Sequence, residues 1–158
     1  MRYSLVLLLT ILAIIKTSTI IGQSLSVSNL HSIVKKDAAE RQIFLLEKGF
    51  KEERVKTEGL KGASNISYSK GHREKFEQVI FQDLENVKTV RYNFGSVATY
   101  SKYHRIIKES SKWSFDSEKD HHSIRIFKYI NRDISSEIEF SIINVSDLNL
   151  YQIAFHNY

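Results

Sequence analysis

Residues 78–94 read QVIFQDLENVKTVRYNF, in which apolar and polar residues alternate on either side of a short polar turn. Such alternation is typical of two half-buried strands joined as a hairpin. Residues 139–155 read EFSIINVSDLNLYQIAF and repeat the apolar phase at an offset of 61 residues. Strands joined by turns this short are antiparallel, because a parallel pair needs a long crossover. The matching positions are Val79 with Phe140, Phe81 with Ile142, Leu84 with Val145, Val87 with Leu148, Tyr92 with Ile153 and Phe94 with Phe155.

A helix is expected before the strands of the first half. Asp37 and Glu40 have the spacing of a capping box, and Gly49 fits the left-handed residue that follows a helix. The pattern predicts a helix over 38–48, preceded by a shorter helix at 28–36. The apolar residues that recur at helical spacing in 38–50, and that we expect to be buried, are Ala39, Ile43, Leu46 and Phe50.

A corresponding helix is expected at the start of the second half, where residues 98–110 read ATYSKYHRIIKES. Ser96 or Thr99 has the side chain of an N-cap. Four apolar or aromatic residues share one face of this helix, which predicts that the face is buried, and they are Tyr100, Tyr103, Ile106 and Ile107.

The fold class expected from these elements is α+β. It is a tandem repeat of a helix followed by three or four antiparallel strands, with the helices packed on one face of the sheet or sheets. The predicted strands include a charged edge strand at 50–56 and a strand with a bulge near Glu77. A half of about 60 residues is marginal alone, so the repeats at 24–95 and 96–158 are expected to share one core.

The first 23 residues, MRYSLVLLLTILAIIKTSTIIGQ, have the pattern of a signal peptide. Arg2 forms a short basic region, Leu5 to Ile15 form the apolar region, and Gly22 is a candidate residue before the cut. The alternative is an uncleaved anchor, although Lys16 interrupts the apolar run. The expected location is secreted or periplasmic, with no Cys for a lipid anchor.

Composition limits the possible chemistry. The absence of Cys from all 158 residues excludes disulfides, thiol catalysis and structural Cys–zinc sites. The chain has 23 Lys+Arg and 18 Asp+Glu, and removing Arg2 and Lys16 with the leader leaves 21 against 18. A surplus this small is not the footprint of a nucleic-acid-binding protein. No later stretch is long enough to span a membrane, so no membrane contact is expected after cleavage.

Few residues point to catalysis or to a cofactor. His121 and His122 beside Asp120 are the strongest metal candidates, but adjacent side chains on an extended chain point to opposite sides. A third ligand such as His72 would be needed, and the spacing fits no zinc pattern. There is no G-x-S-x-G elbow, phosphate loop or dinucleotide fingerprint. We therefore expect no metal, no cofactor and no enzyme activity.

A binding surface is the main functional hypothesis. Tyrosine beside arginine on a sheet face is common at recognition surfaces, because tyrosine gives contact area at low entropic cost. Ordinary packing in the core remains the alternative for each of these side chains. The candidate binding residues are Arg91, Tyr92, Arg125, Tyr129 and Tyr151.

Two resemblances accompany this interpretation. Leu46-Glu47-Lys48-Gly49-Phe50 resembles the L-x-K-G-F helix end of short exported proteins of Bacteroidota-type bacteria, many of which have no assigned function. The order of elements is similar to that of the β-lactamase inhibitory protein family, although that family has disulfides and this chain has none. The second resemblance implies a concave sheet that binds another protein. We expect an exported binding module of the inhibitor or immunity type; the alternatives are a small-ligand or glycan binder with a groove between the repeats, and a weak hydrolase.

Overall fold

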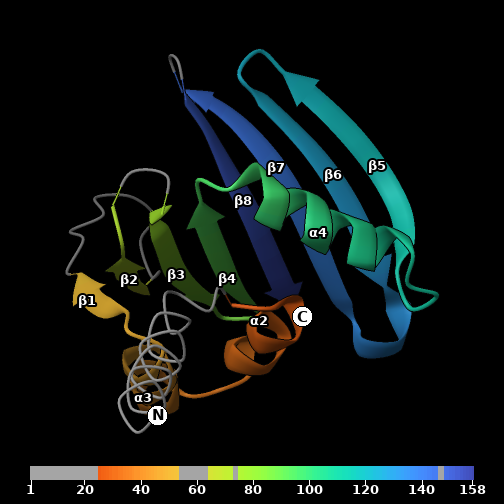
Figure 1. Cartoon of the computed structure of the whole chain (residues 1–158). Helices are drawn as coiled ribbons and strands as arrows, with labels where there is room; N and C mark the ends of the chain where they lie inside the picture. Colours follow the sequence, from red (N-terminus) through yellow and green to blue (C-terminus); the bar gives the residue numbers. More distant parts are fainter. Residues whose placement is uncertain (1–24, 54–63, 73–74, 146–147) are drawn as a thin grey trace, which may run out of the picture.

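The structure, a computed structural model, describes residues 25–53, 64–72, 75–145 and 148–158 (Figure 1). The predicted signal peptide lies outside the described residues, as does the predicted edge strand beyond Glu53. The helices are α2 (Val27–Val34), α3 (Ala38–Glu47) and α4 (Val97–Lys108), and a 3₁₀ turn, η2, spans Arg132–Ile134. The strands are β1 (Lys51–Glu53), β2 (Ser64–Lys70), β3 (Glu77–Leu84), β4 (Val87–Phe94), β5 (Ser114–His121), β6 (Ile124–Asn131), β7 (Ser136–Val145) and β8 (Leu148–Asn157).

All eight strands form one antiparallel sheet, in the order β1-β2-β3-β4-β8-β7-β6-β5. Strands β4 and β8 end the two halves of the chain, and they pair with each other at the centre. The sheet therefore runs through both halves without interruption. The prediction of an α+β fold with antiparallel strands is confirmed.

The helices lie on one face of the sheet, as Figure 1 shows. Helix α2 packs against the central strands β4 and β8, and α3 lies beside the edge strand β1. Helix α4 crosses β8, β7 and β6, where Tyr100 contacts the Phe140 ring and His104 contacts the Phe127 ring. We call the opposite face, which no described helix covers, the open face.

The core consists of rows of apolar side chains that cross the sheet beneath the helices. Because side chains alternate between faces, residues paired across neighbouring strands share one face. One row joins β2 to β6 and contains Ile66, Phe81, Val90, Phe155, Ile138 and Tyr129. The next row contains Tyr68, Val79, Tyr92, Ile153, Phe140 and Phe127.

Helix α3 begins and ends where the sequence predicts. The side chain of Asp37 accepts from the Glu40 backbone N–H, and the Glu40 side chain accepts from the Asp37 backbone N–H. Gly49 follows the helix with φ +80°, and Phe50 is buried after it. The predicted buried face is wrong except at Phe50, since Ala39 is exposed, Ile43 is 59% exposed and Leu46 is 50% exposed. Helix α3 covers the short strands at one end of the sheet, and its inward side chains are Arg41 and Leu45.

Helix α4 also follows its prediction closely. Ser96 is the N-cap and its side chain accepts from the Thr99 backbone N–H. Tyr100, Tyr103 and Ile107 are buried, whereas Ile106 is 46% exposed, contrary to expectation. The sheet accommodates a narrower stripe of the helix than the apolar pattern implies.

The tandem repeat stays a prediction. A helix followed by four strands occurs in both halves. At the offset of 61 residues, Phe81 opposite Val90 corresponds to Ile142 opposite Tyr151, so the register of the two hairpins agrees. The preceding strand differs, because Ile66 faces Phe81 while Phe127 faces Phe140, a shift of two residues.

The bulge predicted near Glu77 is wrong. The register between β2, β3 and β4 is unbroken there. The irregularity lies in β5, where Asp116 is skipped between Phe115 and Ser117.

Candidate functional site

The structure separates the residues predicted to bind a partner. Arg91 lies on the open face, in the same cross-strand row as Ile80 and Ala154. The three tyrosines point instead to the helix-covered face, where the exposed fractions are 0% for Tyr92, 4% for Tyr129 and 7% for Tyr151. Their interpretation as exposed recognition residues is wrong, because each shares a strand face with core residues.

Arg125 lies on the helix side of β6, beyond the cover of α4. Its guanidinium forms an ion pair with Glu118 at 2.5 Å and lies 5.1 Å from the centre of the Phe127 ring. The hydrogen bond from Arg125 to Glu118 raises the Arg125 pKa. Arg125 and Arg91 are therefore on opposite faces and cannot form one surface.

His121 and His122 are exposed at the turn between β5 and β6, and His122 has φ +46°. His72, the third ligand considered, is an exposed residue in the turn after β2. Strand β2 lies near the opposite edge of the sheet from β5. Within the described part of the chain, no three His, Asp, Glu or Cys side chains form a group that could hold a metal.

A hydrogen-bonded row of polar side chains crosses the open face. The Gln152 amide donates to Asn93 Oδ1 at 2.8 Å, and the Asn93 amide donates to Gln78 Oε1 at 3.0 Å. The Gln78 amide then donates to Ser67 Oγ at 3.1 Å, so the row joins β8, β4, β3 and β2. Each amide fixes the orientation of the next, which gives the open face an ordered polar centre.

One ion pair and a histidine–carboxylate contact hold four of the charged or titratable groups of this face. Lys128 Nζ lies 2.8 Å from Glu137, whose carboxylate also accepts from the Tyr158 hydroxyl at 2.9 Å. The hydrogen bond to Glu137 raises the Lys128 pKa. His156 lies 3.6 Å from Glu139, and its approach is the main cause of a lowered Glu139 pKa.

Thr89, His156 and Glu139 form a line of a nucleophile, a base and an acid across the open face. Thr89 Oγ1 is 3.0 Å from His156 Nδ1, and His156 Nε2 is 3.6 Å from Glu139. Thr89 is only 4% exposed, and it lies within β4 between the paired strands β3 and β8. Acyl transfer requires an accessible nucleophile beside donors for the oxyanion, and this buried position within a ladder offers neither. The contacts of Thr89, His156 and Glu139 instead connect the side chains of strands β4, β8 and β7.

One end of the open face is apolar, a feature that sequence reasoning missed. Phe127, Phe140 and Ile153 point to the helix-covered face of β6, β7 and β8. Because side chains alternate along a strand, the residues next to them in these strands point to the open face. Ile124 pairs with Ile143, Ile143 with Leu150, and Val145 with Leu148. The signal is present in the sequence, since these strands carry aliphatic residues in both phases near one end. We call this set the aliphatic patch, and its members are Ile124, Ile126, Ile143, Val145, Leu148 and Leu150.

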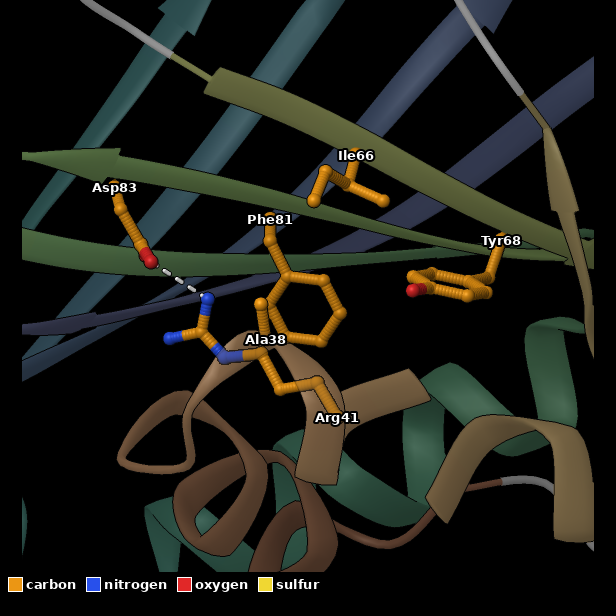
Figure 2. A pocket seen from close by; sticks show the side chains of 6 residues that line it. All are labelled: Ala38, Arg41, Ile66, Tyr68, Phe81 and Asp83. Carbon is orange, nitrogen blue, oxygen red and sulfur yellow. Dashed lines mark hydrogen bonds and ion pairs between the residues drawn. The ribbon is translucent and has the colours of Figure 1, made fainter. Parts of the chain in front are cut away.

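A small pocket lies on the helix side, between α3 and strands β2 and β3 (Figure 2). Arg41 Nη1 donates to Asp83 at 2.7 Å, and its other nitrogens donate to the carbonyl oxygens of Ile33 and Val34. The guanidinium stacks over the Phe81 ring at 4.5 Å. The cavity measures about 50 Å³ and is lined by Ala38, Arg41, Ile66, Tyr68, Phe81 and Asp83.

This pocket serves the fold. Arg41 is 4% exposed and caps the last carbonyls of α2 while it joins α3 to β3. A buried guanidinium needs such partners, because an unpaired one is costly to bury. Asp83 Oδ1 has no hydrogen-bond partner among the described residues, and the cavity has room for a water molecule there.

Comparison with known proteins does not assign the chain. A scan against protein-family models, a search of curated proteins and a search of solved structures each found no match. In the part of the chain that the structure describes, no helix has the length and apolar character needed to cross a membrane.

Proposed function

We propose that this chain is an exported, non-enzymatic binding module that engages a protein partner through the open face, in the manner of an inhibitor or immunity protein. The observation that carries the proposal is the open face, the side of a continuous eight-stranded sheet that none of the described helices covers. The leader-like first 23 residues support export to the periplasm or the medium.

The open face is large enough for a specific interface. Eight strands about 4.8 Å apart span about 34 Å, and the ten residues of β8 span about 33 Å. A standard interface needs about 800 Å² on each partner. A face of these dimensions can supply that area, and the polar row at its centre is already ordered by hydrogen bonds between its side chains.

The alternative, a small-ligand or glycan binder with a groove between the repeats, has less support. The two halves meet through seven residue pairs between β4 and β8, which continue the sheet across their junction. The pocket in Figure 2 lies within the first half, and Arg41 and Asp83 already use each other there. A weak hydrolase is disfavoured by the burial of Thr89.

Paired variants on the two faces test the proposal. The open-face variant is Arg91→Glu with Leu148→Glu. The matched control is Lys88→Glu with Leu46→Glu, which places one charge reversal and one Leu→Glu substitution on exposed helix-side positions. Tagged wild type and both variants are incubated with periplasmic and secreted extracts, and retained proteins are quantified. We expect a stoichiometric partner on wild type and control that is lost from the open-face variant at unchanged folding stability. Retention by all three proteins, or by none, would contradict the proposal.

A further inference from the structure

We propose that the partner is an acidic protein whose aliphatic side chains cover the aliphatic patch and whose carboxylates bind Arg91 and Lys119. This inference rests on the proposed function and adds to it the chemistry of the partner. Three observations carry it: the exposure of the patch, the two cations beside it that make no direct polar contact with other described residues, and the spacing between these cations and the patch.

The aliphatic patch is exposed although it lies within the sheet. Leu148 is 73%, Val145 is 55% and Ile124 is 38% exposed. Their neighbours Ile143 and Leu150 are half-buried in the same rows, so the apolar side chains are contiguous across β6, β7 and β8. Contiguous exposed aliphatic side chains, rimmed by polar groups, mark surfaces that another molecule covers.

Two cations on this face, Arg91 and Lys119, make no direct polar contact with any described residue. Between β3 and β5 in the sheet, the Glu137 carboxylate forms an ion pair with Lys128, and Glu139 lies beside the His156 ring, while Arg91 acts on Glu139 only through space. Asp116, in the bulge of β5, accepts from the Ser117 hydroxyl and acts on Lys128 through space. Among the described residues, Arg91 and Lys119 have no hydrogen-bond or ion-pair partner for their side chains.

Those two cations lie on either side of the patch. Lys119 on β5 is directly opposite Ile126 of β6. Arg91 on β4 is opposite Ala154 of β8, four residues from Leu150, or about 13 Å along the strand. A partner that covers the patch therefore brings its own rim close to both cations, where carboxylates are favoured and ammonium groups are repelled.

A peptide library tests this chemistry directly, because the selection needs only the purified protein. A random dodecapeptide library displayed on phage is selected against that protein, and the affinity of the enriched peptides is measured by titration. The two test variants are Arg91→Gln and Leu148→Ser. The matched controls remove one cation and one leucine side chain from exposed helix-side positions, Lys88→Gln in β4 and Leu46→Ser in α3.

We expect enriched peptides that combine Asp or Glu with Leu, Ile or Val. Their affinity should fall at least tenfold with Arg91→Gln and with Leu148→Ser, and less than twofold with either control. Enriched peptides rich in Lys or Arg that still depend on the test variants would overturn the acidic partner and leave the proposed function standing. Binders insensitive to both test variants, or no enrichment, would overturn this inference.

A membrane surface is the competing occupant of an exposed aliphatic patch. Cosedimentation with vesicles of phosphatidylglycerol and phosphatidylcholine distinguishes it. We expect less than a tenth of the protein to sediment with the vesicles. Sedimentation of most of the wild type, reversed by Leu148→Ser and unchanged by Leu46→Ser, would assign the patch to lipid and overturn the acidic protein.

Discussion

Arg41 shows how much one side chain contributes to this fold. Its guanidinium joins α2, α3 and β3 through two carbonyl oxygens, a carboxylate and an aromatic ring. Removing a buried group of this kind leaves its partners without hydrogen bonds, which costs more than the bonds themselves contribute. The pattern of 38–48 predicts the helix, but not the inward position of an arginine.

We expect Arg41→Met to lower the free energy of unfolding by about 2 kcal/mol, because the substitution leaves Asp83 and two carbonyl oxygens without their donor. The loss is not larger because Asp83 is partly exposed and water can replace the guanidinium there. Urea denaturation measures the change. Arg105→Met on the exposed side of α4 is the control and should stay within about 0.5 kcal/mol of wild type. Equal effects of the two substitutions would show that the Arg41 contacts contribute little.

His104 makes the stability depend on pH. Its ring packs against Phe127 and Phe140, and Nε2 is 2.7 Å from the Tyr129 hydroxyl. Burial lowers the His104 pKa below 6.5, and Lys108 lowers it further. The unfolded chain therefore binds more protons than the folded chain just below pH 6.5, so stability rises with pH in that window and falls on acidification.

We expect the free energy of unfolding to decrease between pH 7.5 and pH 5, and His104→Gln to reduce that decrease. His31 retains part of the slope, because burial and then Lys35 lower its pKa in the same direction. Glu139 contributes in a more acidic range, since its lowered pKa starts from 4.5. Urea titrations at several pH values measure the slope, with exposed His72→Gln as control. An unchanged slope in His104→Gln would refute this assignment.

At the scale of elements, the sequence predicts where helices begin and end and how strand residues alternate. It predicts less well which face of each element is buried. Asp37, Glu40 and Gly49 act through local backbone contacts, so their pattern gives α3 within one residue at its end. Alternation along a strand places Tyr92 on the same side of β4 as Val90 and Phe94, so the sequence predicts its burial. Alternation does not predict which side of the sheet the helices cover. The exposure of Ile43 follows from the side that the helices cover. So does the exposure of the aliphatic patch, because the sequence shows aliphatic residues in both phases of these strands but not which phase stays uncovered.

Two glycines with positive φ allow the conformational cost of adding a side chain to be compared with the steric cost. Gly49 has φ +80° and open space where a Cβ would lie. Gly71 has φ +73°, and an added Cβ would lie 2.1 Å from the backbone oxygen of Lys75. We expect Gly49→Ala to cost about 1 kcal/mol and Gly71→Ala at least about 2 kcal/mol, because backbone must move. Thermal and urea unfolding compare them; a larger loss for Gly49→Ala would contradict the turn geometry.

At the scale of the molecule, neither half is complete without the other. Helix α2 belongs to the first half, yet its His31 ring lies 5.1 Å from Phe155 of β8. Phe94 of β4 stacks on Tyr151 of β8 at 6.3 Å. The pairing of β4 with β8 thus joins two sets of four strands into one core, which the sequence predicts only as a shared core of unstated geometry.

Separating the halves tests this dependence. Produced alone, residues 24–95 and 96–158 would each expose as an edge the strand that is now central, with its apolar side chains uncovered. A domain of about 60 to 70 residues has little stability to spare, so we expect neither piece to unfold cooperatively. Coexpression should restore one cooperative urea transition near that of the intact chain, followed by circular dichroism. A piece that unfolds cooperatively alone, at a midpoint close to that of the whole protein, would show two independent domains and would remove the continuous open face on which partner binding depends.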